Sequence, residues 1–142
     1  MARNEVWQYR GMKGPLLTAR ILWGALFAST LIYLLVLELV TLDAGTDWQA
    51  LLYPLGFAAA ATAIGRLFAP RLLKGQSPNK KEGSYLTALI LALALAESVA
   101  IFGLVLGFLG APATVVVPFF ALCWLLMLVQ FPTTEKLERF VG

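Results

Sequence analysis

The chain has 142 residues, of which 60% are hydrophobic and 13% charged, against about 45–50% and about 25% in soluble domains. This composition excludes an ordinary water-soluble globular protein, and the length predicts a single domain over residues 1–142, without a separate catalytic domain. One cysteine and no histidine exclude a disulfide framework and the common zinc and haem sites, so we expect neither a metal nor a cofactor.

Four apolar blocks are long enough to cross a bilayer, which takes about 20 helical residues. They cover residues 18–41, 49–68, 85–109 and 113–131. The first block follows basic residues, as the core of a signal peptide does. Its apolar run exceeds the usual core of about 7–15 residues, and no small-residue cleavage site follows it, so we expect it to stay in the mature protein. The sequence predicts an all-α fold, a four-helix transmembrane bundle.

The basic residues predict the orientation of this bundle. They precede or open the first block, lie at or between the second and third blocks, and occur in the tail: Arg3, Arg10, Lys13, Arg20, Arg66, Arg71, Lys74, Lys80, Lys81, Lys136 and Arg139. The opposite side carries only Asp43 and Asp47. By the positive-inside rule both termini are cytoplasmic. The net charge of +3 therefore reports topology and gives no reason to expect a nucleic-acid partner; we expect membrane lipid around the protein, in a bacterial inner membrane.

Glu97 lies in the middle of the third block, twelve residues from each of its ends. At about 1.5 Å per residue, this places the carboxyl group close to the bilayer midplane. An ionised carboxylate is costly there, and no lysine or arginine lies at that depth to pair with it. We expect a reversible proton or ion site. The alternative is a permanently protonated glutamate that only hydrogen-bonds a neighbouring helix.

Small residues recur along the same block, and the second block has a similar set. They are Ala88, Ala92, Ala96, Gly103 and Gly107 in the third block, and Gly56, Ala58, Ala59, Ala60, Ala61, Ala63 and Gly65 in the second. Such stripes let helix backbones approach closely. We therefore expect these two blocks to form a tight hairpin at the centre of the bundle, with ordinary packing and no further role as the alternative.

Other polar residues carry simpler predictions. Arg66, at the inner end of the second block, is expected to extend its charge to the interface. Ser29 is expected to bond a carbonyl of its own helix, and Cys123 to fill the core. In the tail, Thr133 or Thr134 is expected to cap a short surface helix.

Residues 94–106 resemble the carboxylate-bearing helix of subunit c, the proteolipid of rotary ATP synthases, and the resemblance extends over residues 49–109. Ile101-Phe102-Gly103-Leu104 is similar to the Ile-Tyr-Gly-Leu-like run that follows the family's acid. The resemblance implies ion binding at Glu97. Ser98 matches the hydroxyl that follows the acid in sodium-binding members, and Thr62 lies near the family's glutamine partner. Phe102 lacks the tyrosine hydroxyl of a sodium site, which favours a proton.

The sequence thus predicts a proteolipid-like membrane protein that forms a homo-oligomer, a ring in the form that the resemblance implies, and binds a proton or ion at Glu97. Ion transport would require a membrane partner that supplies access, because a single midplane acid has no route to water. The alternative is a structural or assembly membrane protein that uses the hairpin for packing alone. No nucleophile–base pair or metal cluster can be assembled from these residues, so we do not expect an enzyme.

Overall fold

The computed structural model describes the backbone of residues 2–40, 47–74 and 81–141, and the side chains of residues 14–40, 47–66, 68 and 85–139. Every described element is a helix, which confirms the predicted all-α class. Several residues used above lie outside the described residues or side chains: Arg3, Arg10, Lys13, Asp43, Arg71, Lys74, Lys80 and Lys81.

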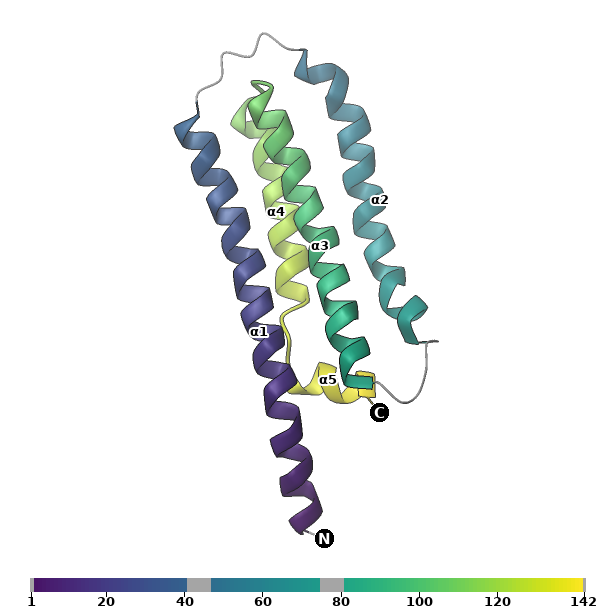
Figure 1. Cartoon of the computed structure of the whole chain (residues 1–142). Helices are drawn as coiled ribbons and strands as arrows, with labels where there is room; N and C mark the ends of the chain where they lie inside the picture. Colours follow the sequence, from purple (N-terminus) through teal and green to yellow (C-terminus); the bar gives the residue numbers. More distant parts are fainter. Residues whose placement is uncertain (1, 41–46, 75–80, 142) are drawn as a thin grey trace.

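Four long helices lie side by side, and a short fifth helix lies across one end of them (Figure 1). They are α1 (Ala2–Leu39), α2 (Trp48–Lys74), α3 (Lys81–Phe108), α4 (Ala113–Val129) and α5 (Thr134–Val141). Successive long helices run in opposite directions, so α1 and α3 run the same way and the start of α1 lies at the same end as α5. At the centre, α3 contacts α1, α2, α4 and α5. The expected hairpin of α2 and α3 is present, but α3 alone occupies the middle of the bundle.

The helices extend beyond the apolar blocks that predicted them. The helix α1 begins at Ala2 rather than at residue 18, and α2 continues to Lys74 rather than ending at residue 68. Backbone hydrogen bonding continues where the side chains become polar, because lysine and arginine are themselves good helix formers. Apolar length therefore marks the part of a helix that suits a membrane and not the helix ends.

Two helices contain stretches long and apolar enough to cross a membrane: Gly14–Leu39 and Tyr85–Phe108, in the part of the chain that the structure describes. The apolar helix Ala113–Val129 is shorter, and the described part of α2 adds no third stretch of this length and hydropathy. Large apolar side chains on α1 face outward, with Leu17, Ile21 and Leu39 each more than 60% exposed. Water would disfavour such a surface, whereas lipid would not.

The core lies along one side of α3 and the facing side of α4. Leu93, Val99 and Leu106 of α3 are fully buried, as is Cys123 of α4, which confirms the prediction that this cysteine fills the core. The turn between the two helices closes through Gly110, whose φ of 87° suits glycine and strains other residues. Ala111 N–H bonds to Leu106 O, and Gly110 N–H to Gly107 O. These two hydrogen bonds form a Schellman motif, which ends α3 and lets the chain reverse so that α4 packs along α3.

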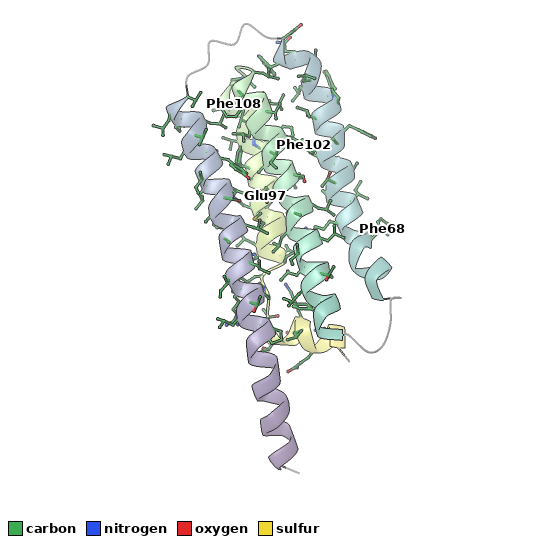
Figure 2. The ribbon with its side chains drawn as sticks, viewed as in Figure 1. Phe68, Glu97, Phe102 and Phe108 are labelled. Atoms are coloured by element: carbon green, nitrogen blue, oxygen red, sulfur yellow. The ribbon has the colours of Figure 1, made fainter. Side chains whose placement is uncertain are left out.

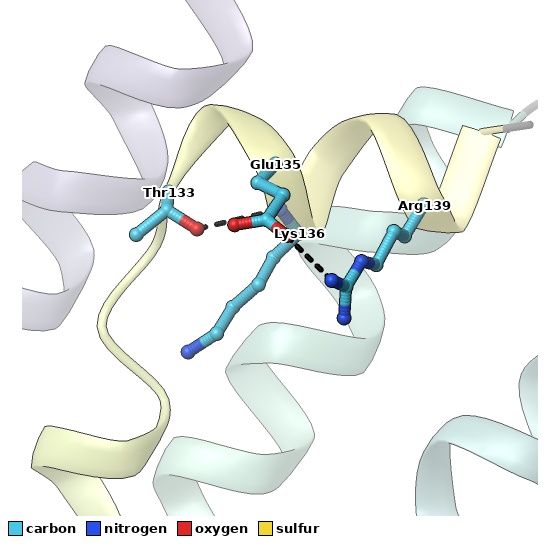
Figure 3. Close-up of polar contacts among 4 residues, drawn as sticks. All are labelled: Thr133, Glu135, Lys136 and Arg139. Carbon is cyan, nitrogen blue, oxygen red and sulfur yellow. Dashed lines mark hydrogen bonds and ion pairs between the residues drawn. The ribbon is translucent and has the colours of Figure 1, made fainter.

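The short helix α5 begins where the tail motif predicted it. The hydroxyl oxygen of Thr133 accepts a hydrogen bond from Lys136 N–H at 3.3 Å, which confirms a threonine cap (Figure 3). Glu135 and Arg139 form an ion pair on its exposed side. Leu137, on the same helix, is fully buried. Because this apolar side chain is enclosed, it holds α5 against the end of the bundle.

Candidate functional site

Glu97 lies about half-way along the bundle, on α3 beside α1 (Figure 2). Two hydroxyl groups of α1 contact the same carboxyl oxygen. Ser29 Oγ lies 2.6 Å from Glu97 Oε1, and Tyr33 OH donates to this atom at 2.8 Å. The site therefore joins two helices through three polar side chains that are all partly buried. Hydrogen bonds of this kind gain strength where water is scarce.

The local geometry of α1 explains why both hydroxyl groups reach one carboxyl group. Residues four apart lie one above the other on the same side of a helix, so Ser29 and Tyr33 point together toward α3. Depth also matches. Ser29 lies ten residues before the end of α1, and Glu97 lies eleven residues before the end of α3. Since the two helices run in the same direction, Ser29 and Glu97 lie at similar heights along the bundle.

The Ser29 hydroxyl has two neighbours that compete for its single hydrogen. Its Oγ lies 2.7 Å from the carbonyl oxygen of Leu26, as well as beside Glu97. When Glu97 is ionised, Ser29 can donate to the carboxylate. When Glu97 is protonated, its O–H can donate to Ser29 Oγ, and Ser29 can donate to Leu26 O. In both patterns Tyr33 donates to Glu97, so the site offers hydrogen bonds to either protonation state.

Aromatic side chains fix α1 against α4 beside this site. Trp23 stacks on Phe27 with ring centroids 5.1 Å apart, and its indole N–H donates to Met127 O at 2.8 Å. On the same side of α1, Trp124 of α4 donates to Thr30 Oγ1 at 2.9 Å. Each indole N–H is thereby paired inside the bundle. Because these contacts lie on either side of Ser29 in sequence, they set the rotation of α1 that directs Ser29 toward Glu97.

The two hydroxyl groups that the resemblance assigned to the ion site lie elsewhere. Ser98 Oγ donates to Ala94 O at 2.9 Å, and Thr62 Oγ1 donates to Ala58 O at 2.7 Å. Both bond a carbonyl of their own helix, one turn earlier. In the described part of the chain, neither has a hydrogen bond to Glu97.

The predicted packing residues separate into two groups. Ala88, Ala92 and Ala96 of α3 are buried, whereas Ala60 of α2 is exposed. A Cβ atom at Gly103 would lie 2.8 Å from Phe119 Cβ of α4, and one at Gly107 would lie 2.6 Å from Leu37 Cδ2 of α1. At Gly56 it would meet nothing within 4 Å. The small residues beyond Glu97 therefore admit α4 and α1, rather than α2.

Comparisons of this chain with models of protein families, with curated proteins and with solved structures find no match. The resemblance to subunit c accordingly remains a prediction, and the geometry around Glu97 is what indicates a function. Among the described residues, no group of three or more histidine, cysteine, aspartate or glutamate side chains is placed to hold a metal ion. The polar centre of this structure is one carboxyl group with two hydroxyl partners.

Ser29 and Tyr33 are the partners that the sequence argument missed. The sequence predicts for Ser29 only a hydrogen bond within its own helix, and this bond to Leu26 O is present. It predicts no role for Tyr33. Their four-residue spacing at the depth of Glu97 is a signal that could have found them. This signal becomes visible only when positions at equal depth on two parallel helices are compared, because Ser29 and Tyr33 are far from Glu97 in the sequence.

Proposed function

We propose that this chain is an integral membrane protein whose four long helices cross the bilayer, with both ends of the chain on the cytoplasmic side. The outward-facing apolar side chains of α1 and the apolar stretch of α3 support this placement. The helix α2 packs along α3 and therefore shares its depth in the bilayer. The positive-inside pattern gives the orientation.

Cysteine accessibility tests this orientation, because the chain's single native cysteine, Cys123, is fully buried and gives little background. New cysteines at Asp47 and Glu138, both exposed, are expected to react with a membrane-impermeant maleimide from opposite sides of sealed vesicles. Labelling of both from the same side would overturn the four-span arrangement.

Within the membrane, the proposed activity is reversible binding of a proton at Glu97. The observation that carries this proposal is the pair of hydroxyl groups, Ser29 and Tyr33, on Glu97 Oε1. An intramembrane carboxyl group is costly to retain and is usually functional. Tyr33 stabilises the ionised form by donating to it, and Ser29 can reverse its hydrogen bond when the proton arrives. The ionised and neutral forms are both accommodated, as reversible binding requires.

Carbodiimide labelling tests the proton site, since the reagent attacks a protonated carboxyl group in apolar surroundings. Labelling of the wild-type protein is expected to fall as pH rises, and Glu97→Gln is expected to abolish it. Glu38→Gln is the matched control, because Glu38 is exposed near the end of the same helix as Tyr33. Labelling that is independent of pH, or that survives Glu97→Gln, would refute the site.

A structural role is the second candidate, and it is favoured by the origin of both hydroxyl groups on α1. The same contacts would then only fix α1 against α3, as a glutamine could also do. The pH dependence of unfolding separates the two roles. A reversible proton site contributes to the pH dependence of stability in the wild-type protein, and Glu97→Gln should lack that contribution. Equal pH profiles for the two proteins would favour the structural role.

We further propose that the chain self-associates through the outer side of α2. Ala60 is exposed there, and a groove of about 210 Å³ runs between Gly56, Ala59 and Ala60 of α2 and Phe119 of α4. Small residues on a membrane helix allow close approach of another helix. Native mass spectrometry of gently solubilised protein should show one closed oligomer, and Ala60→Leu should dissociate it. A wild-type monomer in several detergents would refute self-association.

A further inference from the structure

A pocket of about 270 Å³ lies at the α5 end of the bundle, between α2, α3, the end of α4 and α5. Its polar lining includes Arg66, Gln130, Lys136 and Tyr85, and its apolar lining includes Ala88, Leu89 and Ala92. This pocket is separate from the Glu97 site, whose partners come from α1. Two of its lining residues are cationic and none is acidic.

Arg66 is the most unusual residue of this pocket. It was expected to extend to the interface, but it is only 7% exposed, so its side chain is enclosed by the bundle. In the part of the chain that the structure describes, it has no hydrogen-bond or ion-pair partner. Its side chain lines the pocket, and a partly enclosed guanidinium without a counter-charge favours a nearby anion. Among the described residues that line the pocket none is acidic, so an anion bound there would pair with this guanidinium.

Gln130 and Lys136 add directed hydrogen-bonding groups to this charge. Gln130 Oε1 is buried and has no hydrogen-bond partner among the described residues, although most buried polar atoms in proteins are paired. Lys136 Nζ donates to Val129 O and to Phe131 O, which leaves one of its three N–H donors for a ligand. The pocket thus presents two cations and an amide, and Lys136 is exposed at its mouth.

The apolar wall indicates what kind of anion fits. From Tyr85 to Ala92 the lining extends along α3 for about 10 Å, from the end of the bundle toward its middle. A free inorganic anion would leave this wall without a partner, whereas an acyl chain would cover it. From these features we infer that the pocket binds an anionic phospholipid whose phosphate pairs with Arg66 and Lys136. A headgroup hydroxyl, as in phosphatidylglycerol, bonds to Gln130.

This inference shares with the proposed function only the placement of the chain in a membrane, and it does not depend on protonation of Glu97. The test is native mass spectrometry of the full chain with added phosphatidylglycerol or phosphatidylcholine. The wild-type protein should retain phosphatidylglycerol preferentially. Arg66→Gln should weaken this binding by about tenfold or more, since it removes a charge-assisted pair. Arg139→Gln makes the same change of charge at an exposed position and should bind as the wild type does.

Lys136→Gln provides a second variant that keeps the fold, because Lys136 is exposed; it should also weaken phosphatidylglycerol binding. Equal binding by Arg66→Gln, Lys136→Gln and wild type would overturn the inference, as would an equal loss in Arg139→Gln, which would indicate general charge attraction. Displacement of the lipid by millimolar inorganic phosphate would assign the pocket to a free anion instead. Glu97→Gln should retain the lipid, so failure of the proton site and failure of this pocket are distinguishable.

Discussion

Gly103 offers a direct test of how closely α3 and α4 approach. In Gly103→Ala, the new Cβ would lie 2.8 Å from Phe119 Cβ and 3.3 Å from Phe120 Cε2. The first of these atoms is next to the backbone, so α4 itself must shift. Overpacking of this kind costs about 1–3 kcal/mol. In Gly24→Ala on α1, by contrast, the new Cβ would meet nothing within 4 Å.

Both substitutions gain the same helix propensity, about 1 kcal/mol, so the difference between them isolates the packing cost. We expect Gly103→Ala to be less stable than Gly24→Ala by about 1–3 kcal/mol. Gly24→Ala itself should be slightly more stable than wild type. The assay is reversible unfolding in mixed micelles with increasing SDS, followed by tryptophan fluorescence. Equal stability of the two variants would refute the close approach of α3 and α4 at Gly103.

Three further predictions use the same preparations. Trp23→Phe keeps a ring beside Phe27 but loses the hydrogen bond to Met127 O, and should lower the free energy of unfolding by about 1 kcal/mol; an unchanged value in the SDS titration would contradict this. Leu137→Ala opens a cavity beneath α5 at a fully buried side chain, which costs about 2–5 kcal/mol in a core. Hydrogen exchange over residues 134–141 should therefore rise, while Glu138→Ala, at an exposed position, should leave it unchanged. Cys123, which is fully buried, should react with maleimide only after unfolding, and rapid labelling of the folded protein would mean that α4 is rotated.

The position of Glu97 along its helix could be predicted from one apolar block, whereas its partners require a comparison of depth and spacing between two helices. Apolar length locates Glu97 at mid-depth, because depth depends on distance along one helix. Which helix faces it depends on the rotation and neighbours of α1, which involve residues 64 and 68 positions away in the chain. The resemblance to subunit c directed attention to Ser98 and Thr62, whose hydroxyl groups bond their own helices instead.

Packing residues show the same limit. The small residues of α3 predicted a close approach of some helix, and a Cβ at Gly107 would indeed meet Leu37. The positions of these small residues do not predict which helix approaches, since any neighbouring helix can pack closely where a side chain is missing. Arg66 illustrates a further case: its place at the end of an apolar block suggested exposure, whereas it is only 7% exposed and shares a pocket with residues of α3 and the end of α4.

If the chain spans a membrane as proposed, the hydrogen bonds between Glu97 and the hydroxyl groups of α1 have a consequence for the order in which its helices insert. Synthesis proceeds from the first helix to the third, so Ser29 and Tyr33 are already in place when Glu97 arrives. A third helix inserted without the first would carry its carboxyl group into lipid with neither hydroxyl to receive it. In the proposed membrane placement, α1 would then have to be present before α3 for the carboxyl group to meet its two hydroxyl partners, which is the order of these helices along the chain.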